Sequence, residues 1–77
     1  DQRRVALRTT FLALLLRLGQ FHIERGELPE AIGVFERLIA VEPSRESAYV
    51  FLMEAYAAIG QREAALAQYD RLVLALA

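Results

Sequence analysis

The chain has no cysteine and only one histidine, His22. Without cysteine it can form neither a disulfide framework nor a thiolate metal site. A single histidine also excludes a metal site built on a histidine pair. The four glycines are isolated from one another, so no glycine-rich loop is present to hold a phosphate group. We therefore expect no metal ion and no cofactor.

The chain also lacks a strong net charge and a long apolar run. Its formal charge is -1, which gives no field that would favour nucleic acid or an anionic membrane. The apolar run from Phe11 to Leu18 is interrupted by Arg17 and is too short to span a bilayer. The first residues show no secretory signal and no initiator methionine. We expect a soluble, cytoplasmic piece of a longer protein.

What the sequence does contain is a unit that occurs twice, 34 residues apart. The matching positions are Leu18 and Leu52, Gly26 and Gly60, Ala31 and Ala65, and the segments 35–38 and 69–72. A period of this length indicates stacked helix-turn-helix repeats. We predict one all-α domain over residues 1–77, with one repeat at about 12–45, a second at about 46–77 and four antiparallel helices.

Glycine and proline positions predict where these helices begin and end. Gly26 and Gly60 each follow an apolar helical pattern and are expected to end a helix in the left-handed conformation. Pro29 suits the first turn of the second helix, and Pro43 ends that helix. Ser44 is then expected to cap the third helix. The first helix should run from Gln2 to Arg25, and the fourth from about Arg62 to the end.

The first helix has two apolar faces, although a helix that covers one core needs only one. We expect the core face to contain Leu7, Phe11, Leu14, Leu15, Leu18 and Phe21, with His22 packed among them. The second face is then an extra stripe of Val5, Leu12, Leu16 and Ile23. The predicted core positions of the later helices are Ala31, Phe35, Leu38 and Ile39, then Tyr49, Leu52, Met53, Tyr56 and Ile59, and finally Ala65, Tyr69, Leu72 and Leu76.

These repeats resemble the tetratricopeptide repeat. Ala31 and Ala65 match its close-approach alanines, and Pro43 matches its terminal proline. Leu15 and His22 depart from the pattern, because the family favours tryptophan and tyrosine there.

A narrower resemblance begins at Pro43. The segments Pro43-Ser44-Arg45-Glu46, Leu52-Met53, Ala55-Tyr56, Gly60 and 65–69 resemble the bacterial transcriptional activator domain, a helical module of actinomycete-type regulators. Gln61 departs from it, since arginine is common at that position in the family. The resemblance implies a module for dimerisation and activation, which in the family usually follows a winged-helix DNA-binding domain. The chain itself contains no winged helix.

No residue pattern in the chain predicts catalysis. His22 has no acid or nucleophile at a reachable spacing, and we interpret it as a packed, hydrogen-bonded side chain. The candidate site is instead a protein-interaction surface made of Val5, Leu12, Leu16, Ile23, Val50, Phe51, Glu54, Leu66 and Val73. Either neighbouring helices of the parent protein cover these side chains, or they form a groove for a peptide or helix.

From the sequence we expect a non-enzymatic interaction and oligomerisation module of a bacterial transcriptional regulator. Its partner would be a protein, either a second copy or another domain of the parent chain, with no direct binding to nucleic acid or membrane. The alternative is a generic tetratricopeptide scaffold that binds a peptide or helix in an unrelated assembly.

Overall fold

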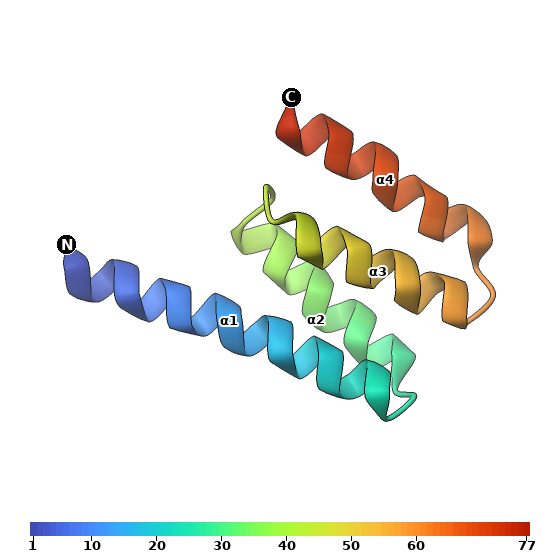
Figure 1. Cartoon of the computed structure of the whole chain (residues 1–77), viewed down its shortest axis with the longest axis horizontal. Helices are drawn as coiled ribbons and strands as arrows, with labels where there is room; N and C mark the ends of the chain where they lie inside the picture. Colours follow the sequence, from blue (N-terminus) through green and yellow to red (C-terminus); the bar gives the residue numbers. More distant parts are fainter.

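The computed structural model describes all residues, 1–77, and consists of four helices with no strand. They are α1 (Gln2–Glu24), α2 (Leu28–Val41), α3 (Glu46–Ala58) and α4 (Arg62–Leu76). Each helix packs antiparallel against the next in a single row, which makes a thin body of 43 × 32 × 13 Å (Figure 1). The all-α fold of two helical hairpins is confirmed. Because α1 and α4 are the first and last helices of this row, each has one face that no other helix of the fold covers.

Equivalent glycines end the first helix of each hairpin. Gly26 and Gly60 have φ angles of 74° and 82°, as predicted for residues that stop a helix in the left-handed region. One residue later, the N–H of Glu27 donates to the carbonyl of His22, and that of Gln61 donates to the carbonyl of Tyr56. These bonds satisfy carbonyl groups that the helix end would otherwise leave unpaired.

The connection between the hairpins differs from the prediction by one residue. Pro29 lies in the first turn of α2 as expected, but Ser44 does not cap α3. The cap position is Arg45, which makes no side-chain capping bond. Its side chain instead donates to Glu42, 2.7 Å away, and the Tyr49 hydroxyl donates to the carbonyl of Pro43. These contacts hold the turn around Pro43, so that α3 begins at Glu46.

The core lies between α1, α2 and α3. Its ten clustered residues are Leu12, Leu15, Ala31, Val34, Phe35, Leu38, Ile39, Ala48, Tyr49 and Leu52. Ala31 is fully buried and Ala65 almost so, which confirms both as small residues at helix contacts. Gly19, in the middle of α1, faces the ring of Phe35, and any Cβ there would clash with it. This glycine allows α1 and α2 to approach closely.

The predicted core face of α1 is wrong. Leu12 is buried, and Leu16 and Ile23 pack against the core, whereas Leu7, Phe11, Leu14, Leu18 and Phe21 are exposed. Only Leu15 of the predicted face is buried. The physical reason is Gly19, which projects to the same side as Leu12, Leu16 and Ile23 at 100° per residue. The close approach to α2 can occur only on the side that has no side chain in the way.

The core face of α4 also differs from the prediction. Ala65 and Gln68 are buried and Leu72 is half-buried, but Tyr69 and Leu76 are exposed. Ile59, which directly follows α3, is exposed as well. Tyr69 occupies the repeat position of Phe35, which α1 and α3 enclose from both sides. Because α4 packs along α3 and touches α2 only through the ion pair between Arg71 and Glu36, the same position on α4 is left uncovered.

Candidate interaction surface

The nine predicted surface residues do not form one patch. Leu12 is buried, and Leu16, Ile23 and Phe51 pack against the core, so four of the nine are structural. Val5, Val50, Glu54, Leu66 and Val73 are exposed, but they lie on three different helices. The residues that do form a continuous apolar surface on α1 are the ones that were predicted to lie in the core.

We call this surface the α1 stripe, which consists of Leu7, Phe11, Leu14, Leu18 and Phe21. Each side chain is between 42% and 66% exposed. Their spacing alternates between four and three residues, which is the a/d spacing of a helix that packs against another helix. At 100° per residue the stripe points about 135° away from the middle of the buried face of α1. It therefore points away from α2.

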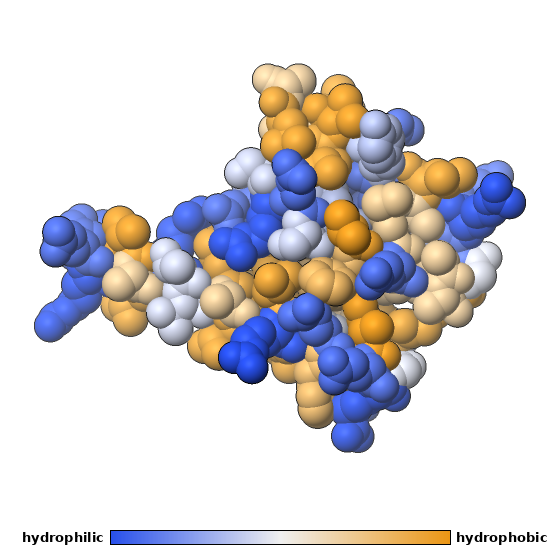
Figure 2. Space-filling view, viewed as in Figure 1, coloured by the Kyte–Doolittle hydropathy of each residue, from blue (hydrophilic) through white to orange (hydrophobic).

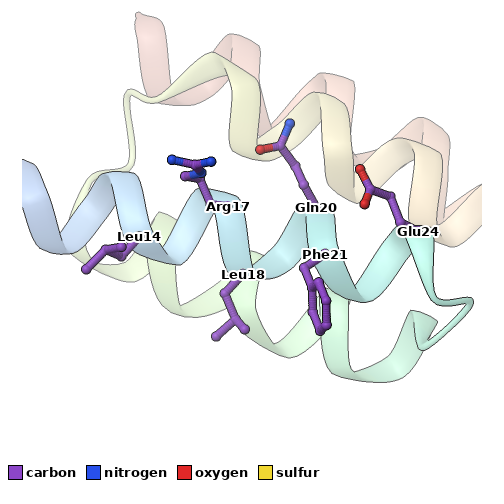
Figure 3. A pocket seen from close by; sticks show the side chains of 6 residues that line it. All are labelled: Leu14, Arg17, Leu18, Gln20, Phe21 and Glu24. Atoms are coloured by element: carbon purple, nitrogen blue, oxygen red, sulfur yellow. The ribbon is translucent and has the colours of Figure 1, made fainter.

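A row of polar side chains borders the α1 stripe on one side. The row consists of Arg17, Gln20 and Glu24. Their side chains point to one side of α1, whereas those of Leu14, Leu18 and Phe21 point to the other (Figure 3). These six residues line a shallow surface depression that belongs to α1 alone. Its walls come from one helix, so it is a helix surface and not a cleft between elements.

A second apolar row lies on the outward side of α4. We call it the α4 stripe, which consists of Leu66, Tyr69, Val73 and Leu76, all about half exposed. Figure 2 shows apolar side chains gathered over this end of the molecule, where α4 forms the last layer. The exposure of Leu66 and Val73 agrees with the stripe predicted for them.

The 34-residue repeat shows what the equivalent positions do inside the molecule. Leu66, Tyr69 and Val73 correspond to Ile32, Phe35 and Ile39 of α2, which are buried or packed against the core. Leu14, Leu18 and Phe21 correspond to Ala48, Leu52 and Ala55 of α3, all fully buried. Both stripes therefore occupy positions at which helices pack against each other within the fold.

The predicted groove residues on α3 do not share one surface. Val50 and Glu54 are exposed, but Phe51 stacks on Phe35 with 5.4 Å between the ring centroids. The second surface depression is lined by residues 60–64, at the turn before α4. Neither depression joins α1 to α3, so no groove runs across the first helices of the two hairpins.

His22 takes part in a small polar cluster at the α1–α2 turn. Its Nδ1 lies 2.9 Å from Oε1 of Glu27, and Nε of Arg25 lies 3.3 Å from the same oxygen. The hydrogen bond from His22, together with the charge of Arg25, lowers the pKa of Glu27. His22 is half-buried, and its hydrogen bond agrees with the structural role predicted for it.

One bidentate ion pair connects the two hairpins. Arg71 of α4 donates to both carboxylate oxygens of Glu36 on α2, at 2.7 and 2.9 Å, and its guanidinium lies over the ring of Tyr49 on α3. The hydrogen bonds to Glu36 raise the pKa of Arg71. Arg71 also donates to the side-chain oxygen of Gln68, so the buried amide of Gln68 has a hydrogen-bond partner. This network orients α4 on α3 and takes no part in either stripe.

Nothing in the fold assembles the side chains that a metal site needs. No group of three histidine, cysteine, aspartate or glutamate side chains is placed to hold a metal ion. No helix is both long and apolar enough to cross a membrane. All buried side-chain nitrogen and oxygen atoms have a hydrogen-bond partner, so the interior contains no polar group that requires a ligand.

A family model described as the bacterial transcriptional activator domain matches residues 1–77, the whole chain. No curated protein and no solved structure matched the chain in the corresponding searches.

Proposed function

Since the chain belongs to the bacterial transcriptional activator domain family, we propose that it is a protein-interaction and oligomerisation module of a bacterial transcriptional regulator. It has no catalytic activity of its own and no direct contact with nucleic acid, and it works in the cytoplasm, where bacterial promoters are. The family is one of regulatory domains, and this supports the non-enzymatic role.

The observation that carries the proposal is the α1 stripe. Fully burying a large apolar side chain contributes about 1.5–3 kcal/mol, and a partner that covers the exposed half of these five side chains would gain a corresponding part of that for each. Contiguous apolar surface of this kind marks interaction sites in proteins. Its a/d spacing specifies the kind of partner, which is another helix.

The alternative role, a scaffold that holds a peptide between the first helices of its hairpins, has less support. Phe51 is occupied with Phe35, and the surface depressions do not connect α1 with α3. The family match over the whole chain also favours a regulator over an unrelated assembly.

A reporter assay in bacterial cells tests the proposal. The chain is fused to a DNA-binding domain that lacks a dimerisation region, and transcription is measured from a promoter with two operator half-sites. We expect the fusion to change transcription, and Leu14→Glu to remove the effect because it places a charge in the stripe. Ala13→Glu, on the exposed side of the same helix, is the matched control and should keep the effect. A fusion no more active than the DNA-binding domain alone would contradict the proposal.

A further inference from the structure

The N-terminal half of α1 extends beyond the rest of the molecule. All residues from 1 to 11 are exposed, and Figure 1 shows this part of α1 projecting past the ends of α2 and α3. Its one hydrogen bond to another helix is from Arg8 to the carbonyl of Val41, the last residue of α2. A helical segment without packing is marginal in water. The α1 stripe runs through this unsupported half from Leu7 onward.

We propose that the α1 stripe binds the α1 stripe of a second copy, so that the two helices lie antiparallel along their whole length. This inference rests on the proposed oligomerisation role and specifies its partner. Each copy's projecting N-terminal half then packs against the C-terminal half of α1 in the other. The contact is two-fold symmetric, because the same surface is used on both sides.

The length of α1 selects the register. In the full register, the residue numbers of two side chains that face each other across the contact add up to 25, and the helices overlap from end to end. The layers are then Phe11 with Leu14, Leu7 with Leu18, and Phe21 with the side chain of Arg4 of the second copy. Shifting by one heptad, to a sum of 32, leaves the first seven residues of each copy without a partner. The full register alone supports the part of α1 that has no packing in the monomer.

Charge complementarity selects the same arrangement. In the full register Arg3 of one copy flanks Glu24 of the other, twice by symmetry, at positions that set partner choice in helix pairs. The shifted register instead places Arg17 beside Arg17 of the second copy. A parallel pair places Arg3 beside Arg8 and Arg4 against Arg4. Antiparallel helices also bring the positive end of each helix dipole next to the negative end of the other.

Side-chain size argues against a head-to-tail stack in which α1 of one copy packs on α4 of another. Within the fold, α3 uses Ala48 and Ala55 at the positions that correspond to Leu14 and Phe21 of α1. Both alanines are fully buried, so α3 is closely packed at these positions, whereas Leu14 and Phe21 would bring larger side chains to the same positions against α4. Such overpacking is unfavourable. The α1 stripe suits the wider spacing of two helices with large residues at every a and d position.

The contact is small but sufficient for weak dimerisation. From Leu7 to Phe21 the stripe is about 21 Å long at 1.5 Å per residue. Five half-exposed large side chains on each copy amount to roughly 1,000 Å² in total, near the lower limit for a specific interface. We expect a dissociation constant on the order of 10–100 μM.

Sedimentation equilibrium of the 77-residue chain tests the pairing, over protein concentrations that bracket the expected dissociation constant. The wild type should change from monomer to dimer, and Leu18→Glu should stay monomeric while keeping its helical circular dichroism, because Leu18 is 42% exposed. Ala13→Glu carries the same charge change on the exposed side of α1 and should still dimerise. A monomer at every concentration, or association that survives Leu18→Glu and is lost with Val73→Glu, would overturn the proposal.

Charge exchange and crosslinking test the register. Arg3→Glu and Glu24→Arg should each weaken dimerisation by about 3- to 10-fold, and combining them in one chain should restore it. Because the chain has no cysteine, introduced thiols are unambiguous. A short bismaleimide should crosslink a mixture of Thr10→Cys and Arg17→Cys chains, and neither variant alone. Efficient crosslinking of Arg17→Cys alone would show the shifted register and overturn the one proposed.

The two tests separate the inference from the proposed function. A chain that is monomeric in solution but still changes transcription as a fusion refutes the pairing and leaves the regulatory role intact. A chain that dimerises through α1 but is inert as a fusion would support the pairing and refute the regulatory role.

Discussion

Gly19 of α1 lies directly against the ring of Phe35 on α2. A Cβ built on Gly19 would stand less than 3.0 Å from three carbons of that ring, closer than real Cβ atoms come to a neighbour. Phe35 is itself fully buried and stacks on Phe51 from the other hairpin, so the ring has little room to move. This contact determines how close α1 and α2 can be and which face of α1 becomes the core.

Gly19→Ala should therefore destabilise the fold even though alanine is the better helix former. We expect a loss of about 1–3 kcal/mol from overpacking, measured by urea unfolding. Gly33→Ala is the matched control, since Gly33 is exposed in α2 and a Cβ there meets nothing within 4 Å. It should stabilise the chain by about 0.5–1 kcal/mol. Equal gains in both variants would show that the Gly19 contact is not close.

The two helix-ending glycines should resist substitution by β-branched residues. At Gly60, with its φ of 82°, valine should cost about 1–2 kcal/mol or more because its Cβ collides with the following carbonyl. Asparagine tolerates the left-handed region better, so Gly60→Asn should lose less than Gly60→Val. The melting temperatures of the two variants decide this, and the reverse order would be inconsistent with the conformation described.

The buried alanines should not accept larger side chains. Ala31 has no exposed surface, and Ala31→Leu is expected to push α1 and α2 apart at a cost of about 1–3 kcal/mol. Ala40→Leu, at an exposed position of the same helix, should change the free energy of unfolding by less than about 0.5 kcal/mol. If Ala31→Leu melts at the wild-type temperature, the helix contact is looser than described.

Acid should weaken the α1–α2 turn through Glu27. The pKa of Glu27 is lowered in the folded chain, mainly by the hydrogen bond from His22, so the carboxylate stabilises the fold above the ordinary glutamate pKa of about 4.3. That contribution is lost as the pH falls through the lower folded-state pKa. Glu27→Gln should reduce the fall in melting temperature on acidification, whereas Glu54→Gln, which removes an exposed carboxylate outside the ion pairs of the fold, is the control. An acid response identical to the wild type would exclude this role for Glu27.

Much of the fold was predictable from the sequence, because its signals are local. Gly26 ends its helix and Ala31 permits a close helix contact at their own positions in the chain. The 34-residue period repeats these same residue types in the second hairpin. The face of α1 was not predictable from apolar spacing alone, because both faces carry large apolar residues. The signal that distinguishes them is Gly19, since a glycine inside a helix costs about 1 kcal/mol and is often kept for a close contact.

The candidate surface was predicted only in part for the same reason. An exposed stripe on α1 was expected, but the core face of α1 was predicted wrongly. The predicted stripe therefore contained buried residues such as Leu12. The α4 stripe was found at Leu66 and Val73 because Ala65 fixed the orientation of that helix. Tyr69 and Leu76 were missed, since their exposure depends on how α4 packs against α3 and not on their own spacing.

Hydrogen–deuterium exchange of α1 at different protein concentrations shows whether the α1 stripe is an interaction surface used by a second copy. The amides of residues 5–11 should exchange quickly in dilute solution and become protected as the concentration rises through the dissociation constant. Those of α3, which lies away from the stripe, should not change. Exchange of residues 5–11 that is independent of concentration, in a chain that remains folded, would show that a second copy does not bind the α1 stripe.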